Sequence, residues 1–261
     1  MDRPRVLGVI PARLGSERLP RKPLYVLAGR PLIEWVWRRV AAFSVLDAVV
    51  VATDSEEVAE VCVGFGAAVE LTSPEHASGT ERVAEVVARP GYREYDVVVN
   101  VQGDEPFVTE EQVAEAARLV REGWDVGTVA APVETLEAWR DPSVVKVVRR
   151  EDGGALYFSR SPVPYRRDGE PRPEDLSSSS YLRHIGIYAY TPAALARWVA
   201  LPPNDLERLE RLEQLRPLAA GLSIGVAVVA GTEGGIDTLD DARRAEQRLR
   251  PTWDRPTSAV T

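Results

Sequence analysis

The sequence predicts an α/β fold, Rossmann-like, in which a doubly wound and mostly parallel sheet lies between layers of helices. Short buried apolar runs alternate with segments of helical periodicity along most of the chain. Two of these runs, residues 6–10 and 96–101, lead directly into loops of small and charged residues, where ligands bind parallel sheets. A chain of 261 residues with 44% hydrophobic content can bury the core of such a fold.

The pattern in the first half of the chain predicts alternating strands and helices. The strand at residues 6–10 should stop at Pro11, because proline cannot donate to a ladder, and Pro31 should begin a helix. Asp54 and Glu57 form a capping-box pattern that should open the next helix, and Thr109 and Gln112 repeat this pattern. The other expected elements are strands at 47–52, 67–71, 96–101 and 126–133, and helices at 80–88 and 110–123.

The pattern changes to shorter strands after residue 144. We expect residues 144–192 to form a smaller β-rich excursion within one domain spanning residues 1–250. Helices are expected at 192–200 and 206–216, a buried strand at 222–230, and a last helix opened by Thr238 and Asp241. The Pro/Thr/Ser-rich residues 251–261 are expected to be a flexible tail.

The composition excludes several classes of protein. A net charge of −8 argues against broad binding to nucleic acid or to a membrane surface. No apolar run is long enough to span a membrane, and no signal peptide is recognisable. The single cysteine, Cys62, excludes a disulfide framework. We therefore expect a cytoplasmic protein.

The loop that follows the first strand is cationic. It carries Arg13, Arg18, Arg21 and Lys22 together with small residues, so side chains and backbone amides can converge on one anion, for which a phosphate chain is the natural candidate. A solvated basic loop that pairs with surface carboxylates is the alternative. Only two of the 32 basic residues are lysines, and a lysine ammonium suits a point contact to phosphate.

Two aspartates stand at the ends of buried strands. Asp104 follows the strand at 96–101, and Asp237 follows the strand at 222–230. Carboxylates in these positions can meet on one Mg²⁺, which prefers one or two carboxylates together with substrate phosphates. Either aspartate could instead cap a turn or a helix. His76 and His184 are the only histidines, which excludes a histidine-rich metal site, and His184 reads as a strand-end residue.

Several motifs in a fixed order resemble those of the 3-deoxy-manno-octulosonate (KDO) cytidylyltransferase family, also called CMP-KDO synthetases. They run from about residue 5 to 248 and include Ile10-Pro11-Ala12-Arg13, Lys22-Pro23-Leu24, Ser78-Gly79-Thr80-Glu81-Arg82, Asn100-Val101-Gln102-Gly103-Asp104-Glu105-Pro106, Lys146-Val147-Val148, Ala155-Leu156-Tyr157-Phe158-Ser159-Arg160, Arg183-His184-Ile185-Gly186-Ile187-Tyr188, Leu212-Glu213-Gln214-Leu215-Arg216 and Asp237-Thr238. The chain departs from the family pattern at Arg21, where a glycine is usual, and at Gly15-Ser16-Glu17.

The resemblance implies a nucleotide-diphospho-sugar transferase type of fold, a homodimer formed through residues of about 150 to 190, and transfer of CMP from CTP to KDO. It implies Mg²⁺ on Asp104 and Asp237, with Lys22 and Arg13 also catalytic. The implied nucleotide-binding residues are Pro11, Ala12, Arg13, Ser16, Arg18, Lys22, Ser78, Gly79, Thr80, Arg82, Gln102 and Asp104. The residues implied to orient the sugar acid are Gln102, Arg160, His184, Tyr188, Glu213 and Gln214.

Three other functions stay open at this point. The same chemistry could act on another acid sugar, such as a sialic acid or an amino analogue of KDO. The chain could also be a non-catalytic nucleotide-binding module in which the aspartates serve only as caps. A glycosyltransferase is less favoured, because the strand end carries one aspartate rather than an Asp-x-Asp metal clasp.

Overall fold

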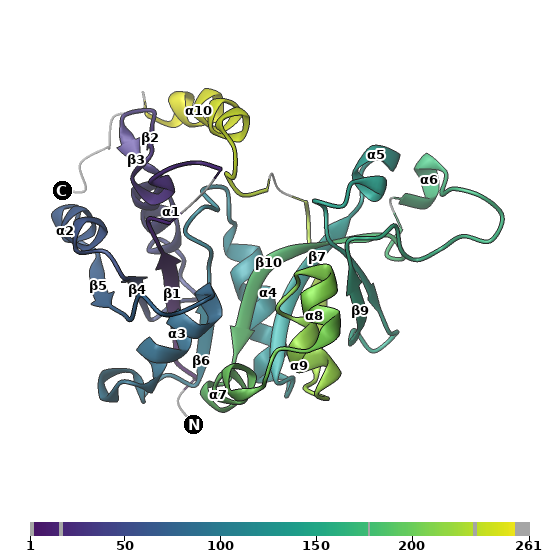
Figure 1. The fold of residues 1–261 in the computed structure, drawn as a ribbon, viewed down its shortest axis with the longest axis horizontal. Helices are drawn as coiled ribbons and strands as arrows, with labels where there is room; N and C mark the ends of the chain where they lie inside the picture. Colours follow the sequence, from purple (N-terminus) through teal and green to yellow (C-terminus); the bar gives the residue numbers. More distant parts are fainter. Residues whose placement is uncertain (1–2, 16–17, 177, 232–233, 254–261) are drawn as a thin grey trace.

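A computed structural model describes residues 3–15, 18–176, 178–231 and 234–253. Its strands are β1 (Val6–Ala12), β2 (Val26–Leu27), β3 (Arg30–Pro31), β4 (Ala48–Thr53), β5 (Ala68–Leu71), β6 (Val97–Asn100), β7 (Val126–Pro132), β8 (Lys146–Arg149), β9 (Ala155–Ser159), β10 (Leu182–Tyr190) and β11 (Ile224–Val228). The main sheet of the described residues has the order β11-β7-β10-β6-β1-β4-β5, and β8 and β9 extend it beside β10 (Figure 1).

The longer helices are α1 (Leu32–Val40), α2 (Glu56–Gly64), α3 (Gly79–Ala88), α4 (Glu110–Arg121), α7 (Pro192–Ala200) and α10 (Leu239–Trp253). The shorter ones are α5 (Leu136–Arg140), α6 (Pro173–Leu176), α8 (Asp205–Glu210) and α9 (Leu215–Ala219), with 3-10 turns η1 (Lys22–Leu24) and η2 (Pro90–Tyr92). None of the helices in the described ranges combines the length and the apolar character needed to cross a membrane.

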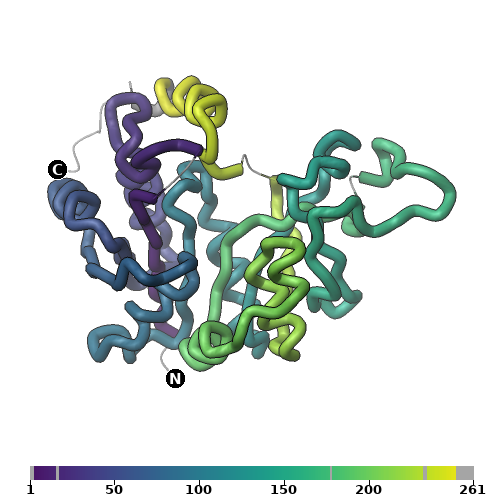
Figure 2. The backbone as a smooth tube through the Cα atoms, viewed as in Figure 1, coloured from purple at the N-terminus to yellow at the C-terminus, as the bar shows by residue number. Residues whose placement is uncertain are grey.

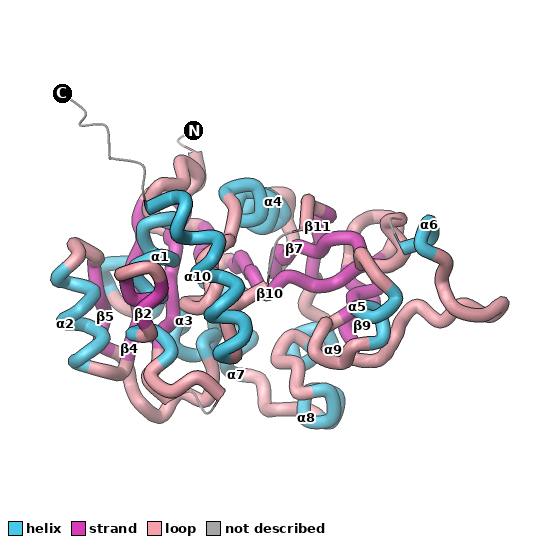
Figure 3. The backbone as a smooth tube through the Cα atoms, turned by 90° about the horizontal axis from the view of Figure 1, so that it is seen from above, coloured by secondary structure: helices cyan, strands magenta, loops and turns pink. Residues whose placement is uncertain are grey.

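Helices cover both faces of the sheet, and each face has its own apolar core. On β1, Ile10 belongs to the apolar core that includes residues of α1, α2, α4 and α10, whereas Leu7 and Val9 belong to the second core, which includes residues of α3, α7 and α9. In the view from above, α1 and α10 lie on the same side of the sheet, near β2 (Figure 3). The expected sheet between layers of helices and its doubly wound arrangement are therefore confirmed.

The sheet is parallel except around β10 and its hairpin neighbours. β1 pairs in parallel with β4 and β6, β4 with β5, and β7 with β11, whereas β10 runs antiparallel to both β6 and β7. The β8–β9 hairpin packs against β10, β11 and α9, whereas the long segment after β9 extends away from the rest of the molecule (Figure 2). The expected β-rich excursion begins with this hairpin and returns to the sheet as β10.

Three local expectations were wrong. β1 continues through Pro11 to Ala12, because pairing with β6 ends at Val9 and the missing N–H of proline costs no bond there. The cap of α2 is Ser55, whose side chain accepts from the Val58 amide, rather than Asp54. The helix expected at 206–216 is two helices, α8 and α9, separated by Arg211 in the left-handed conformation (φ 51°).

Two expectations concern the end of the chain. The first turn of α10 is bracketed as expected, since the Asp241 amide donates to Thr238 Oγ1 at 3.2 Å. This helix continues to Trp253, past residue 250, where the tail was expected to begin. The remaining part of the expected tail, residues 254–261, lies outside the described residues.

Candidate functional site

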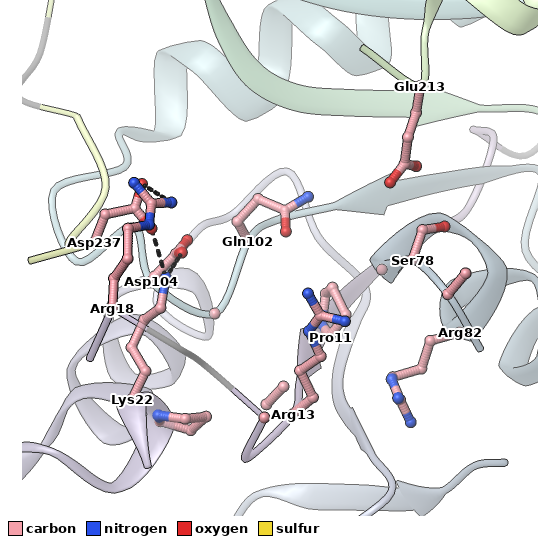
Figure 4. A pocket seen from close by; sticks show the side chains of 16 residues that line it. Pro11, Arg13, Arg18, Lys22, Ser78, Arg82, Gln102, Asp104, Glu213 and Asp237 are labelled. Carbon is pink, nitrogen blue, oxygen red and sulfur yellow. Dashed lines mark hydrogen bonds and ion pairs between the residues drawn. The ribbon is translucent and has the colours of Figure 1, made fainter. Parts of the chain in front are cut away.

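A pocket of about 700 Å³ opens at the carboxyl ends of β1 and β6. Its walls combine the cationic loop, the start of α3, the loop after β6 and two residues from the last third of the chain (Figure 4). The lining residues are Pro11, Ala12, Arg13, Gly15, Arg18, Lys22, Pro23, Ala77, Ser78, Gly79, Arg82, Gln102, Gly103, Asp104, Glu213 and Asp237. Most of the residues expected to bind the nucleotide therefore meet in one cavity.

The end of β1 and the loop after β6 are packed so closely that only glycine fits at one position. A Cβ atom on Gly103 would lie 2.7 Å from the Pro11 carbonyl oxygen, closer than a side chain tolerates. This contact brings the loop carrying Gln102 and Asp104 against the loop that follows Ala12. The glycine thus lets the two loops share one pocket wall.

The basic loop turns at Arg21, which caps η1 in the left-handed conformation (φ 56°). Glycine adopts this conformation without steric cost, which accounts physically for the glycine expected here from the resemblance. The Arg21 guanidinium pairs with Glu57 on α2 and is absent from the pocket lining found among the described residues. Ser16, another expected nucleotide-binding residue, lies outside the described residues.

The start of α3 forms the opposite wall. Ser78 caps the helix by accepting a hydrogen bond from the Glu81 amide, and Gly79 packs against the Pro11 ring. Arg82 is 2% exposed and pairs with Asp54 at 2.8 Å. Its guanidinium is therefore held rigidly at the pocket edge.

A lysine lies between the two strand-end aspartates. Lys22 Nζ donates to Asp104 Oδ2 at 2.6 Å and to Asp237 Oδ1 at 2.8 Å, and Arg18 reaches Asp237 Oδ2 at 3.1 Å. Burial alone would lower the pKa of Lys22, but the charges of Asp104 and Asp237 outweigh burial and raise it. The ammonium is thus fully protonated at neutral pH.

Backbone contacts explain how residues so far apart in sequence meet. The Ile236 amide donates to the Asp104 carbonyl oxygen at 2.9 Å, which joins the two aspartate loops. Asp241, on α10, accepts from the Asp237 amide at 3.1 Å and so fixes the second loop. Sequence reasoning identified Asp241 only as a helix cap, and its position four residues after Asp237 was the available signal.

The residues present fit a divalent cation whose remaining ligands come from a phosphate. No cluster of three or more histidine, cysteine or acidic side chains able to hold a metal occurs among the described residues. Two carboxylates that face each other, Asp104 and Asp237, are nonetheless the usual protein contribution to Mg²⁺ sites completed by substrate phosphates. Their location beside a basic loop suits that arrangement.

Glu105 is an acidic residue that the sequence analysis did not single out. Burial, and then the negative charge of Asp104, raises the pKa of Glu105 to about 8. It therefore stays mostly neutral at pH 7, so that it adds little negative charge beside Asp104 and Asp237. Its place directly after Asp104 was the only signal in the sequence.

The residues expected to orient the sugar acid are divided between two cavities and the core. Gln102 and Glu213 line the main pocket, whereas His184 lines a groove of about 1170 Å³ that shares Arg18 and Asp237 with it. Tyr188 and Gln214 are buried, and neither lines these two cavities among the described residues.

Two of these residues have surroundings that the sequence did not indicate. Arg160 donates from Nε to the Glu210 carbonyl oxygen at 2.7 Å and from Nη1 to the Pro142 carbonyl oxygen at 2.9 Å. The His184 ring packs edge-on against Phe158, and desolvation lowers its pKa to about 3, so it is neutral. The prediction that Arg160 and His184 contact a sugar stays a prediction.

The second lysine is fully buried. Lys146 Nζ donates to the carbonyl oxygens of Asp141, Val144 and Arg160 at 2.9, 2.6 and 2.7 Å. An ammonium with three donors satisfies three carbonyls that an arginine fork could not reach together. Both lysines of this arginine-rich chain therefore occupy positions that require a compact cation.

Comparisons with known proteins find cytidylyltransferases. The cytidylyltransferase family model matches residues 7–224. The 3-deoxy-manno-octulosonate cytidylyltransferase of Gemmatimonas aurantiaca is 51% identical over 95% of this chain and 94% of its own length. That of Halorhodospira halophila is 45% identical over 97% of this chain and 100% of its own.

Solved structures give the same result. A CMP:2-keto-3-deoxy-manno-octonic acid synthetase complexed with CTP has 37% identity and a TM-score of 0.86, covering 95% of this chain and 99% of that one. A 4-diphosphocytidyl-2C-methyl-D-erythritol synthase from Anaerococcus prevotii, at 15% identity and a TM-score of 0.62 over 95% of this chain and 100% of that one, shares the fold. The chain belongs to the 3-deoxy-manno-octulosonate cytidylyltransferase family of nucleotidyltransferases.

Proposed function

We propose that this protein activates KDO for lipopolysaccharide synthesis by the reaction CTP + KDO → CMP-KDO + pyrophosphate. The observation that carries the proposal is the joining of Asp104 and Asp237 around one cation, at the edge of a pocket lined by Arg13 and Arg18. A triphosphate brings the anion that such a basic loop binds and the oxygens that complete a divalent-cation site.

The nucleotide would occupy the main pocket along its length. Arg13, Arg18 and Lys22 would bind the phosphates, and Ser78 and Gly79 would enclose the cytidine. In Figure 4, Arg18 and Lys22 lie beside Asp104 and Asp237, on the opposite side of the pocket from Ser78. Pro11, Ala12, Thr80, Arg82 and Gln102 would shape the wall between them.

Asp104 and Asp237 would hold Mg²⁺. When bound, this ion would stabilise negative charge on the α-phosphate and lower the pKa of the sugar hydroxyl. The two carboxylates would set its position through the backbone bond that joins their loops.

The protein residues would act by positioning and by charge neutralisation. The anomeric oxygen of KDO would form a bond to the α-phosphorus as the bond from that phosphorus to the bridging oxygen breaks, and the hydroxyl proton would leave to solvent. Lys22 and Arg18 would neutralise the departing pyrophosphate. None of the described side chains is needed as a general base in this account.

The sugar acid would approach from the side of the pocket where Gln102 and Glu213 stand. Its carboxylate would need a cation, for which Arg160 is the candidate from the resemblance, with His184, Tyr188 and Gln214 shaping the site. Arg160 binds backbone carbonyls in the structure, so we propose that it would exchange at least one of them for the sugar carboxylate.

Two further properties belong to the proposal. A homodimer would form through residues of about 150 to 190, where β9 pairs only with β8 among the described strands and Tyr165 is 83% exposed. Sedimentation equilibrium would test this state.

We also propose that the protein acts in the cytoplasm, where CTP is made and where a free thiol such as Cys62 stays reduced.

Pyrophosphate release tests the reaction. Purified protein with Mg²⁺ should be assayed with each of the four ribonucleoside triphosphates and with KDO, 8-amino-KDO or N-acetylneuraminate as acceptor. Release with CTP and KDO alone would support the proposal. Release with another acid sugar instead would replace the substrate, and failure of the folded protein with every pair would favour a nucleotide-binding module.

A further inference from the structure

The Lys22 ammonium occupies the space between the two carboxylates that would hold the metal. Its Nζ atom contacts Asp104 Oδ2 and Asp237 Oδ1 at 2.6 and 2.8 Å, and the lysine side chain is only 16% exposed. Arg18 is 67% exposed and reaches Asp237 alone, so water weakens its contribution. Lys22 is therefore the principal counter-charge of the pair in this structure.

An ammonium and a divalent cation cannot occupy this space together. Both would lie between the same two carboxylates, which bind the ammonium through Asp104 Oδ2 and Asp237 Oδ1, and their positive charges would repel at such a distance. Leaving the two facing carboxylates with no cation is also unfavourable in a partly buried site. One cation must therefore leave as the other enters.

The Lys22 ammonium can leave the two carboxylates only when another anion is present to bind it. It begins η1 and lines the same pocket as Arg13 and Gly15. Among the described residues, Lys22 forms ion pairs with Asp104 and Asp237 alone. The phosphates of a nucleotide bound in the pocket would provide the alternative partner.

We propose that Lys22 closes the Asp104 and Asp237 pair in the nucleotide-free protein, so that a divalent cation gains these carboxylates only when a triphosphate accepts the lysine. This inference rests on the proposed function. Metal and nucleotide then bind as one unit, and the free protein takes up little metal. Lys22 is thus a positioning residue for the metal as well as a phosphate ligand.

Binding of Mn²⁺, followed by the paramagnetic resonance of the free ion, tests the proposal without substrate. The apparent affinity of a site falls with the fraction of molecules in which it is open, so Lys22→Met should bind Mn²⁺ about tenfold or more tightly than the parent protein. Arg208→Met, which removes an exposed cation from α8, is the matched control for net charge and should leave the affinity unchanged. Equal Mn²⁺ affinity in Lys22→Met and the parent would overturn the proposal.

The unmodified protein offers a second measurement, because its sequence contains only Lys22 and Lys146. Protein labelled with ¹³C at the lysine ε-carbon should give two signals, and buried Lys146 serves as the internal reference. We expect Mg²⁺ alone to leave the Lys22 signal in place, and Mg²⁺ with α,β-methylene-CTP to shift it while Lys146 stays unchanged. A shift of Lys22 by Mg²⁺ alone, or none with the metal and nucleotide together, would contradict the proposal.

The two proposals can fail separately. Neither measurement uses a sugar or counts turnovers, so an inactive protein would still report whether Lys22 excludes the metal. Conversely, an active cytidylyltransferase in which the free protein binds Mn²⁺ as tightly as Lys22→Met would retain the proposed function and lose only this inference.

Discussion

Thr80 Oγ1 donates a hydrogen bond to Glu213 Oε2 at 3.0 Å, joining the first turn of α3 to the break between α8 and α9. Burial raises the pKa of Glu213, and hydrogen bonds from Thr80 and Ser78 only partly offset this effect. The carboxylate is thus held in the pocket wall at some cost in stability, as expected of a group retained for binding.

Glu213→Gln should therefore separate stability from activity. The pKa of the Glu213 carboxyl is raised in the folded protein, so this group lowers the free energy of unfolding as the pH rises above its pKa in the unfolded chain. The Glu213→Gln variant, whose amide does not ionise, should therefore be at least as stable as the parent at pH 7. We expect KM for KDO to rise about tenfold with KM for CTP little changed, because a lost charged hydrogen bond costs roughly 1.5–3 kcal/mol. A rise confined to KM for CTP would instead place Glu213 on the nucleotide.

Lys146→Met should destabilise the fold. The variant leaves the carbonyl oxygens of Asp141, Val144 and Arg160 without their donor, and we expect a loss of about 2–4 kcal/mol in the free energy of unfolding. Urea denaturation measures this loss, with Arg208→Met as the control for removal of an exposed cation. A change below about 0.5 kcal/mol would show that these hydrogen bonds contribute little.

The His184 imidazole predicts a pH dependence of stability. Its pKa is lowered to about 3 by desolvation, so between about pH 3 and the unfolded value near 6.5 the unfolded chain binds a proton that the folded protein does not. Above this pH window the neutral ring makes its full contribution to the free energy of unfolding. As the pH falls through the window, this contribution decreases by at most about 1.4 kcal/mol per pH unit.

Comparison with His184→Gln isolates this effect, because the amide does not titrate. The difference in unfolding free energy between parent and variant should shrink as pH falls from 7 toward 4, measured by chemical denaturation at each pH. A difference that stays constant across this range would mean that the imidazole titrates alike in both states.

Arg21 and its left-handed backbone give a prediction about the basic loop. A residue with a Cβ atom loses roughly 1–2 kcal/mol in this conformation, so Arg21→Gly should be about 1 kcal/mol more stable than Arg21→Ala. Both variants lose the exposed ion pair with Glu57, which makes alanine the matched control. We expect both variants to keep turnover, since Arg21 is absent from the pocket lining found among the described residues. Equal free energies of unfolding for Arg21→Gly and Arg21→Ala would contradict backbone strain at this position.

Much of the site could be predicted from the sequence because its residues lie at the ends of strands. Asp104 follows a buried run of valines, and parallel strands end at the same edge of a sheet, so its loop and the one after β1 were expected at that edge. The pairing of β1 with β6 makes the two loops neighbours. Asp237 could be placed beside them because it too follows a strand. The backbone bond between Ile236 and Asp104 confirms that the two loops meet.

Other features depend on contacts that the local sequence does not encode. The sequence around β10 does not say that it enters the sheet antiparallel between β6 and β7, because a strand buried on both faces has the same pattern in either direction. The break at Arg211 is similar, because residues 206–216 have good helix propensity. That break carries Glu213 into the pocket, so tertiary packing decides its position.

The role of a cation also depends on its partners. Arg160 and Lys22 are both basic residues in motifs, yet the first binds backbone carbonyls and the second binds two carboxylates. Residue type predicts the kind of partner, and only the fold determines which partner lies within reach.

The role of Asp104 as a metal ligand is the central element of the proposed mechanism. Its most direct test is the rate of pyrophosphate release from CTP and KDO by Asp104→Asn, with Asp205→Asn, whose side chain is 90% exposed, as the matched control. We predict that Asp104→Asn loses at least about a hundredfold in turnover while its circular dichroism and thermal transition stay close to those of the parent. Near-normal turnover by the folded Asp104→Asn protein would contradict the assignment of the metal and the mechanism built on it.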